Sequence, residues 1–166
     1  MPSEPRATRP DMPGYGIVSA AEGDGLLPWS WARERLAKAR NYFLATTRPG
    51  GAPHVMPIWG LWIDDTFQFS TGKTSRKAKN LAAEPRCVVV PEGGDEAIIV
   101  EGVAGELAGG EKLARFFAAY KEKYAYDVSS MGEPLYVVAP SVVYGQIEKT
   151  FTKSATRWTF EPARTP

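Results

Sequence analysis

The sequence predicts an α+β protein built mainly from an antiparallel barrel or closed sheet. Six or seven short segments rich in β-branched and aromatic residues alternate with Gly, Pro and Asp turns. Few stretches show the apolar spacing of a helix. The chain has 166 residues, 43% of them hydrophobic and 23% charged, which suffices for one ordinary domain with its own core. Many strands and few helices favour a barrel over a layered parallel sheet.

Two regions are expected along the chain. Residues 1–27 are rich in Pro and Gly and are interpreted as an arm, flexible or draped, while residues 28–166 form the folded domain. A single cysteine, Cys87, excludes an internal disulfide framework and fits a reducing compartment. The net charge of +1 gives no overall attraction for nucleic acid or membrane, and no signal peptide or membrane span is recognisable. We therefore expect a cytoplasmic protein that binds neither nucleic acid nor membrane.

The first half of the domain is expected to be one helix followed by strands. The helix covers residues 29–40, where Pro28 suits the helix start and one face is apolar (Trp29, Ala32, Leu36, Ala39). A Pro-Gly-Gly turn at 49–51 and an Asp pair at 64–65 separate the segments that follow. These segments are expected as strands at 41–47, 53–63 and 66–70.

The second half contains a longer helix between pairs of strands. Residues 111–124 place apolar side chains in one stripe, which predicts an amphipathic helix buried through Leu113, Phe116, Phe117, Tyr120 and Tyr124. Gly93-Gly94 joins two strands before it. The remaining strands are expected at 86–92, 97–108, 135–140, 141–149 and 154–162.

The stretch STGKTSRKAKNL, residues 70–81, predicts a polar loop and a short helix with an unusual charge. Ser75 suits the N-cap and Pro85 ends the helix, so Arg76 and Lys77 fall in the first turn. Cations there oppose the helix dipole and cost a few tenths of a kcal/mol each, roughly. A nucleotide-binding P-loop is excluded, because it needs Gly where this chain has Phe67.

The same loop contains the donors that a phosphate requires. Backbone N–H groups and hydroxyls fix the geometry of a phosphate, and Arg grips two of its oxygens. The candidate residues are Ser70, Thr71, Lys73, Thr74, Ser75, Arg76 and Lys77. The alternative is a solvated basic helix face, to which we assign Lys79. Because the cations crowd the unfavourable end of the helix, we favour the anion site.

The strand at 53–63 is the second candidate. Pro57 removes a ladder donor and marks an edge or a bulge, and Gly60 permits close approach to the backbone. Alternation gives two apolar faces, Val55, Pro57, Trp59 and Leu61 on one and His54, Met56, Ile58 and Trp62 on the other. One face can cover the core and the other a flat ligand or a subunit. For at least one of the two tryptophans, simple core packing is the better interpretation.

No catalytic residue can be named from the sequence. His54 is the only histidine and is interpreted as a structural residue of the strand edge, and no metal site is expected. Cys87 is interpreted as a small buried hydrophobe, and no G-x-S-x-G elbow supports a hydrolytic triad. Tyr120, Tyr124 and Tyr126 are candidate proton donors without an assigned place. A phosphate grip and a ring platform without acid–base groups indicate that a bound cofactor supplies the chemistry.

The order of these motifs resembles a known superfamily over about residues 28–160. FQFSTGKTSRKAKNL followed by VEGVAGEL is similar to the pyridoxamine 5′-phosphate oxidase-like, flavin-binding split β-barrel proteins. Their pattern falls on Phe69, Thr71, Ser75, Arg76 and Lys77. ARNYFLATTRPGGAPHVMPIWGLW and the terminal SATRW resemble the branch of oxidoreductases that use the deazaflavin coenzyme F420.

The resemblance implies a homodimer with a cofactor at the subunit interface. Ser70, Thr71, Ser75, Arg76 and Lys77 would hold the cofactor phosphate. The residues implied around the rest of the cofactor are Met56, Pro57, Ile58 and Trp59 at the ring, Lys73, and Arg157 and Trp158 of the partner subunit. Departures from the oxidases, Gly145 in place of a tryptophan and Ala97 in place of a glutamine, argue against vitamin B6 oxidation and weaken tight FMN binding.

The expected function is therefore that of an F420-dependent reductase. It would pass a hydride from the reduced deazaflavin to a small conjugated molecule. One alternative is an FMN-dependent oxidoreductase. A second alternative, from a different class, is a non-catalytic carrier of a flavin or a haem-like molecule.

Overall fold

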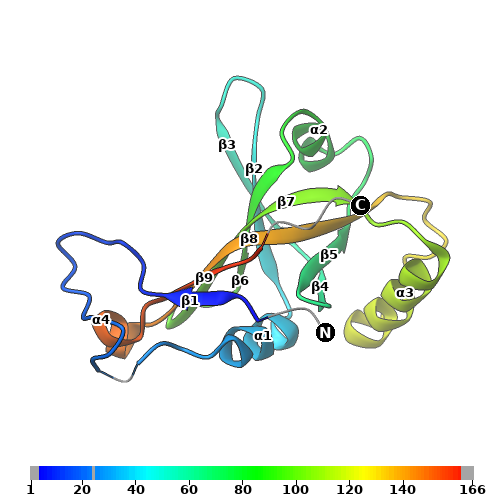
Figure 1. The fold of residues 1–166 in the computed structure, drawn as a ribbon. Coiled ribbons are helices and arrows are strands. Elements are labelled where there is room, and N and C mark those ends of the chain that lie inside the picture. Colours follow the sequence, from blue (N-terminus) through cyan, green and yellow to red (C-terminus); the bar gives the residue numbers. More distant parts are fainter. Residues whose placement is uncertain (1–3, 24, 162–166) are drawn as a thin grey trace.

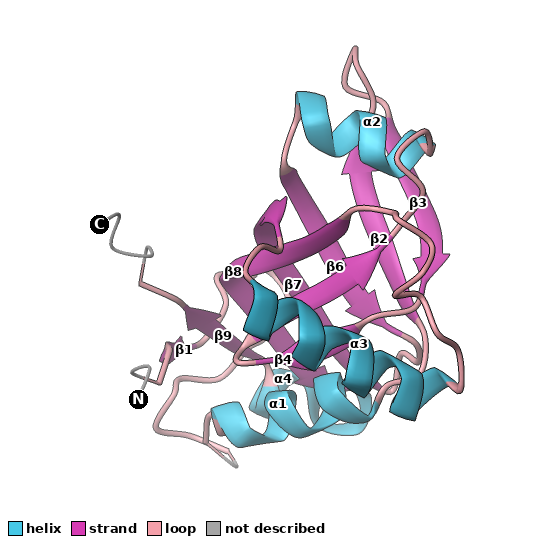
Figure 2. Ribbon diagram, turned by 90° about the vertical axis from the view of Figure 1, so that its right-hand side faces the viewer, coloured by secondary structure: helices cyan, strands magenta, loops and turns pink. Residues whose placement is uncertain are grey.

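An antiparallel sheet of nine strands, rolled into a barrel, forms the centre of the computed structural model, which describes residues 4–23 and 25–161 (Figures 1 and 2). This confirms the α+β class and the antiparallel barrel. The strands are β1 (Arg6–Thr8), β2 (Tyr42–Thr47), β3 (Pro53–Ile58), β4 (Leu61–Ile63), β5 (Thr66–Ser70), β6 (Arg86–Pro91), β7 (Glu96–Glu106), β8 (Leu135–Ile147) and β9 (Thr156–Thr159). The helices are α1 (Trp29–Lys38), α2 (Arg76–Ala83), α3 (Gly110–Tyr124) and α4 (Phe151–Ser154), with a 3₁₀ turn, η1 (Glu148–Thr150), before α4.

The long strand β8 organises the barrel. The strands follow the order β1-β9-β8-β7-β6-β2-β3, and β5 joins β4 to β8. Along one edge, β8 pairs with β7 from end to end, while its other edge pairs first with β5 and then with β9. β3 lies at the end of this order, and its chain continues directly into β4. The barrel is therefore closed by the chain at the β3–β4 corner and keeps an open edge along β3.

The predicted turns have the backbone that their residues require. Asp64 and Asp65 both have positive φ, 51° and 54°, as the two-residue turn between β4 and β5 needs. The turn between β2 and β3 places Gly50 and Gly51 at φ of 91° and 92°. These are conformations that glycine adopts without strain. A third turn, between β6 and β7, has Gly93 at φ 98°. In all three hairpins, the residues of the turn thus suit its backbone conformation.

One predicted strand is divided in the structure. The segment 53–63 forms β3 and β4, separated by Trp59 and Gly60. The backbone N–H of Gly60 donates to the Tyr124 hydroxyl at 3.0 Å, so a side chain takes the place of a strand partner. A Cβ at Gly60 would lie 2.3 Å from the Phe67 ring, and only glycine fits this corner.

Two other differences concern the C-terminal half and the arm. Segments 135–140 and 141–149, expected as two strands, form the single strand β8, in which Ser141 is the extra residue of a bulge opposite Glu101 and Gly102. The 3₁₀ turn begins at Glu148, before the expected end of the strand 141–149, α4 includes Ser154, and the strand expected at 154–162 is shortened to β9. Within the arm expected at 1–27, residues 6–8 form β1, which pairs with β9; residues 1–3 and 24 of the arm and 162–166 of the domain lie outside the described residues.

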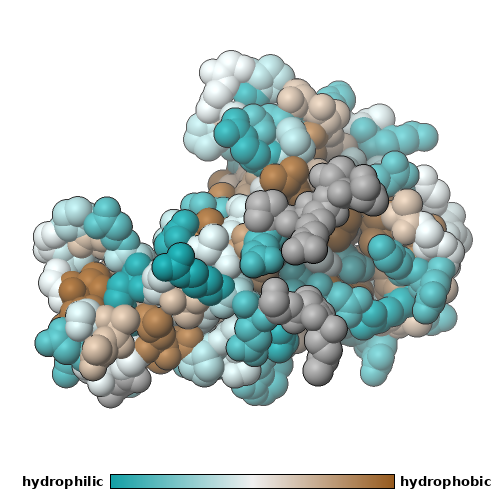
Figure 3. Space-filling model, viewed as in Figure 1, coloured by the Kyte–Doolittle hydropathy of each residue, from teal (hydrophilic) through white to brown (hydrophobic). Residues whose placement is uncertain are grey.

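The arm and α4 form a lobe at one side of the barrel, at the left of Figure 1. The Arg9 guanidinium donates to the carbonyl of Ala155 at 2.9 Å, and Val18 N–H donates to the Thr152 carbonyl at 3.0 Å. Apolar surface gathers over this lobe in Figure 3, and the rings of Tyr15 and Phe151 lie 5.9 Å apart. The described arm is therefore draped along the C-terminal segment.

The predicted helices form, and most residues of their predicted apolar faces are buried, while Ala39, Leu113 and Phe117 are half-buried. In α1, Trp29, Ala32 and Leu36 are buried, and in α3 Phe116, Tyr120 and Tyr124 are buried. The first group packs into the barrel core, and the second forms a separate apolar cluster with Leu61, Leu107 and Leu135. The two helices thus fill different apolar clusters, although both contact β4 and lie near it in the lower part of Figure 2.

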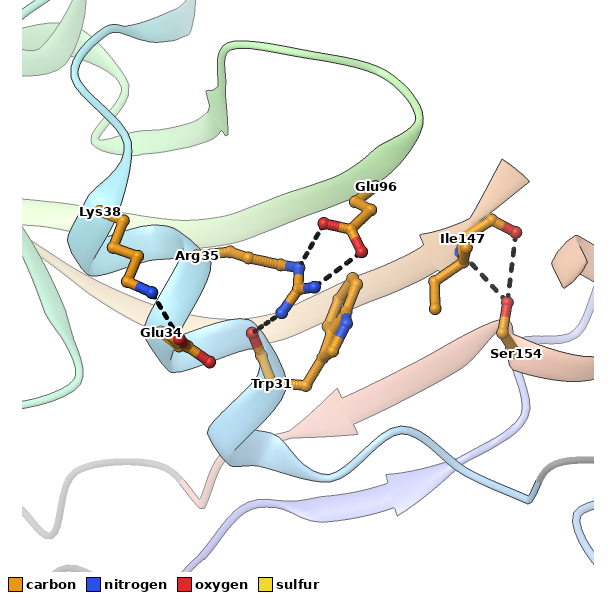
Figure 4. A network of polar contacts seen from close by, with 7 residues as sticks. All are labelled: Trp31, Glu34, Arg35, Lys38, Glu96, Ile147 and Ser154. Carbon is orange, nitrogen blue, oxygen red and sulfur yellow. Dashed lines mark hydrogen bonds and ion pairs between the residues drawn. The ribbon is translucent and has the colours of Figure 1, made fainter. Parts of the chain in front are cut away.

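A polar contact joins α1 to the sheet (Figure 4). The Arg35 guanidinium donates to both carboxylate oxygens of Glu96 on β7, at 2.7 Å each. The same guanidinium lies 4.3 Å from the centre of the Trp31 ring. Trp31 in turn stacks on the fully buried Trp158, with ring centres 6.5 Å apart. Both indoles cover Gly145, where an added Cβ would lie 2.6 Å from Trp158 and 2.9 Å from Trp31.

Gly145→Ala should therefore destabilise the fold. The added methyl has no room between two indoles, and overpacking of this kind costs about 1–3 kcal/mol. Urea unfolding followed by tryptophan fluorescence measures the change. Gly105→Ala is the matched control, because Gly105 also lies in a long strand but has no atom within 4 Å of an added Cβ. The control should be unchanged or slightly more stable, and equal stability of the two variants would contradict the packing argument.

Candidate functional site

The N-terminus of α2 has the cap and the charge that the sequence predicts. Ser75 is the N-cap, and its hydroxyl accepts from the backbone N–H of Ala78 at 3.1 Å. The first turn contains no acidic residue and begins with Arg76 and Lys77. Arg76 is exposed and Lys77 half-buried. The structure thus places two cations at the positive end of the helix dipole, as expected.

The cationic side chains at the start of α2 form no ion pair with any residue that the structure describes, although the Glu133 carboxylate lies against the backbone of the loop before it. Within the described residues, Lys73, Arg76 and Lys77 make no ion pair. The cations that do pair are elsewhere on the molecule: Arg33, Arg35, Lys38, Arg86, Arg115 and Lys121. The uncompensated charge makes the α2 terminus a strong candidate for an anion site.

The polar groups of the loop before α2 are only partly engaged. Ser70 donates its hydroxyl to the Pro134 carbonyl at 3.2 Å, and the hydroxyl oxygens of Thr71 and Ser75 lie 3.3 Å apart. The backbone N–H of Lys73 donates to a carboxylate oxygen of Glu133 at 2.8 Å. A carboxylate of the same chain therefore already accepts from one backbone N–H of this loop.

The edge strand β3 presents one face inward and one outward. Met56 lies opposite Leu44 in the register, on the inward face, whereas Val55 and Pro57 lie opposite Ala45 and Phe43 on the outward face. Met56 and Pro57 are exposed, and Ile58 is buried. The alternation expected from the sequence holds as far as Ile58 and ends at the Gly60 corner.

Trp59 lies at the end of this edge with one ring face covered. Its indole stacks on Tyr124 with ring centres 4.7 Å apart and an angle of 10° between the planes. Its Nε1 donates to Asn41 Oδ1 at 3.1 Å. Tyr126 meets it edge-on at 6.4 Å. Trp62, by contrast, is buried in the core, which agrees with core packing for one of the two tryptophans.

The last turn of α3 holds the corner beside Trp59, a role that the sequence did not reveal. The Tyr124 hydroxyl lies 2.8 Å from the Gly60 carbonyl oxygen and 2.7 Å from that of Arg40. Lys123 donates to the Gly60 carbonyl at 3.1 Å and to the Tyr42 hydroxyl at 3.0 Å. Burial, and then the charge of Arg40, lowers the pKa of Lys123 to about 8. The only sequence signal was the tyrosine stripe of this helix, and that predicts burial without naming a partner.

Arg157 and Trp158, the residues expected from a partner subunit, differ in accessibility. Trp158 is fully buried in the core, and we leave it out of the proposed site. Arg157 is half-buried on the outward face of the sheet and lines a cavity of about 600 Å³ together with Tyr144, Gln146 and Arg9. Arg157 lies opposite Tyr144 on β8, whereas Ser70, at the end of β5 that leads to α2, lies opposite Leu135 near the other end of β8. Within one chain, the length of β8 therefore separates Arg157 from the loop before α2.

Solved structures with the same fold have different functions in their names. A conserved hypothetical protein from Mycobacterium tuberculosis is 23% identical, with a TM-score of 0.65, and the match covers 81% of this chain and 89% of that chain. An F420 reductase is 20% identical, with a TM-score of 0.56 and coverage of 67% and 94%. A haem-binding protein from Mycobacterium smegmatis is 19% identical, with a TM-score of 0.59 and coverage of 74% and 59%. At these identities the likeness establishes the split-barrel fold.

By sequence, the chain matches a family model but no curated protein. No helix among residues 4–23 and 25–161 is long and apolar enough to cross a membrane. The family model described as pyridoxamine 5′-phosphate oxidase matches residues 31–148, well over half of the 166 residues. The chain therefore belongs to the pyridoxamine 5′-phosphate oxidase family, within the split-barrel proteins that include an F420 reductase.

Proposed function

We propose that this protein is an F420-dependent reductase that acts as a homodimer. The observation that carries the proposal is the pairing of an uncompensated cationic helix start, at Arg76 and Lys77, with the open edge of β3. A deazaflavin presents the matching chemistry, a phosphate joined to a flat tricyclic ring. The likeness to an F420 reductase supports the choice of cofactor.

The phosphate fits the α2 terminus. Arg76 and Lys77 supply charge, the first-turn N–H groups supply fixed donors, and the hydroxyls of Thr71 and Ser75 lie beside them. Ser70 and Lys73 complete the loop. A bound phosphate anion there would offset the unfavourable interaction of these cations with the helix dipole.

The ring fits the edge of β3. Met56 to Trp59 offer backbone groups without a strand partner on one side, and the corner at Gly60 holds Trp59 in place. A bound flavin or deazaflavin would supply the hydride chemistry. The chain would orient the ring, exclude water and hold the substrate against it. The exposed rings of Trp59 and Tyr126 are the proposed aromatic wall of the substrate site, and the buried Tyr124 supports Trp59 from behind.

A second copy of the chain is proposed to cover the outward face of the sheet. This face exposes Phe43, Val55 and Val103 at 44%, 54% and 46%. The cavity at Arg157 lies farther along the same face, because Tyr144 and Ile99, opposite each other in the register, both line it. Packing two such faces together would let each subunit add Arg157 to the site that β3 and α2 of the other subunit form.

Two alternative functions make different predictions. An FMN-dependent oxidoreductase would use the same loop and edge, since FMN shares the ring and the phosphate. A non-catalytic carrier of a flavin or haem is favoured by the likeness to a haem-binding protein. Turnover of a reduced cofactor in the presence of a conjugated substrate would exclude the carrier.

Arg76→Ala and Lys77→Ala should each weaken cofactor binding by about one to two decades, since a charged contact to phosphate contributes roughly 1.5–3 kcal/mol. The folded state should be unchanged or stabilised, because each variant removes a cation from the positive end of a helix. Lys79→Ala, an exposed cation of the same helix, is the matched control and should bind normally. Fluorescence titration with FMN and with F420 measures the affinities. If all three variants bind as tightly as the parent protein, Arg76 and Lys77 belong to a solvated helix face and not to a phosphate site.

The deazaflavin should bind more tightly than FMN, and its advantage should shrink as salt rises. F420 continues beyond the phosphate into an acidic tail, and Lys73 is an exposed cation beside the phosphate loop. Such a rim charge contributes about 1 kcal/mol or less and is screened over about 10 Å at roughly 0.1 M salt. Paired titrations at low and high salt, repeated with Lys73→Ala, test this. Tighter binding of FMN at both salt concentrations would promote the FMN-dependent alternative.

Val55→Glu should convert a dimer into a monomer. Val55 is exposed in the single chain, so the change should leave the fold intact, whereas a buried charge at a subunit interface is strongly unfavourable. Light scattering at micromolar concentration measures the state. Ala37→Glu, at an exposed position of α1, serves as the control and should remain dimeric. A monomeric parent protein would contradict the proposed assembly.

A further inference from the structure

A cavity lies between the N-terminal arm and the outward face of the sheet, at the side of the barrel where β1 and β9 are drawn in Figure 1. Its volume of about 600 Å³ falls within the range of small-molecule pockets. The arm forms one wall, and β7, β8 and β9 form the other. The residues that matter for a ligand are Arg9, Pro10 and Met12 of the arm, and Ile99, Tyr144 and Arg157 of the sheet.

The arm wall of this cavity is fixed by strand pairing and hydrogen bonds. β1 pairs with β9, so the arm runs beside Arg157. The Arg9 guanidinium then donates to the Ala155 carbonyl at 2.9 Å and to the Glu22 carbonyl at 3.2 Å. Pro10, the next residue, is buried. The cavity is therefore part of the fold of a single chain.

Two guanidinium groups line this cavity without a carboxylate partner. Within the described chain, neither Arg9 nor Arg157 forms an ion pair. Arg157 is half-buried, and its Nη1 donates to the Thr159 hydroxyl at 2.8 Å. The Nε of Arg9 is buried and has no hydrogen-bond partner among the described residues. Asp11, the acidic residue of the lining, is exposed and pairs with neither arginine. The wall therefore carries an excess of positive charge that an anion would satisfy.

Much of the remaining wall is apolar. Pro10, Met12 and Ile99 contribute hydrocarbon surface. Tyr144, the register partner of Arg157, adds an aromatic ring with a hydroxyl. Pockets for small organic molecules commonly combine apolar walls with a few polar groups that fix the orientation of the ligand. The lining thus suits a ligand that has an apolar body as well as a negative charge.

We propose that this cavity binds an organic acid, with the carboxylate at Arg157 and the apolar body against Met12 and Ile99. A guanidinium matches a carboxylate because it donates two parallel hydrogen bonds to it. Arg9 adds positive charge and holds the arm over the ligand. Binding here needs neither the cofactor nor a second subunit, so the inference goes beyond the proposed function.

The carboxylate has two possible sources. One is a free organic acid. The other, which rests on the proposed function, is the acidic tail of a deazaflavin held by the partner subunit. Both sources present the same carboxylate to Arg157, and the experiment separates them.

Cinnamate is the probe, because it joins one carboxylate to a flat apolar body, and cinnamamide is its neutral match. Calorimetric titration of the full chain without added cofactor should show that cinnamate binds about tenfold or more tightly than cinnamamide, since a hydrogen bond to a charged group is worth roughly one to two decades in affinity. Added salt should weaken the binding of cinnamate and not that of cinnamamide. Equal affinity for the two probes, or binding of neither, would overturn the inference.

Arg157→Gln should lower the affinity for cinnamate about tenfold or more and leave that for cinnamamide unchanged. Arg6→Gln is the matched control, because Arg6 is an exposed cation opposite Thr159 on the same face and does not line the cavity. It should bind both probes as the parent protein does. An equal loss in the two variants would indicate general attraction by surface charge and would contradict a site at Arg157.

Competition with the cofactors distinguishes the two sources. Displacement of cinnamate by F420 and not by FMN would assign the cavity to the acidic tail, and displacement by neither would assign it to a separate organic acid. Displacement by FMN, which has no carboxylate, would contradict a carboxylate site. If cinnamate fails to bind while F420 or FMN still binds through Arg76 and Lys77, the inference fails and the proposed function survives.

Discussion

The hydrogen bonds between the last turn of α3 and the backbone of Gly60 are the constraint on which the rest of the barrel depends. Tyr124 and Lys123 bind the peptide groups that would otherwise extend a strand. The chain therefore turns from β3 into β4 at this point and closes the barrel. A glycine is required because the Phe67 ring leaves no space for a Cβ. β3 is left as an open edge, with Trp59 at one end and the α2 side of the barrel at the other.

The other feature that shapes the candidate site is electrostatic. Arg76 and Lys77 begin a helix without an acidic residue in its first turn. A structural helix would be more stable with the opposite charge there. Under the proposed function, a bound anion supplies the missing negative charge. The Glu133 carboxylate accepts a hydrogen bond from the Lys73 N–H, so an anionic oxygen already binds one backbone donor of this loop.

The fold by itself does not select one chemistry. The relatives with the same barrel include an F420 reductase and a haem-binding protein, and a fold supports several functions when its surface sites change. In this chain the specific features are the exposed edge of β3, the cations at α2 and the outward apolar face. Together they are the basis of the proposal that a phosphate-bearing flat cofactor binds between two subunits.

Local sequence signals determined most elements of this protein, and tertiary contacts decided how they join. Asp64-Asp65 and Gly50-Gly51 predicted their turns because those turns need positive φ, and Ser75 predicted the start of α2 because its hydroxyl reaches the N–H of Ala78. Reasoning from the sequence wrongly predicted β3 and β4 as one strand and β8 as two strands. The reason is that an alternating pattern of side chains does not show which backbone groups find a hydrogen-bond partner. The positions of Lys123, Tyr124 and Arg9 likewise depend on residues distant in the chain. Charge and capping act over a few neighbouring residues and are visible in the sequence, whereas the burial and pairing of a side chain depend on what the folded chain brings against it.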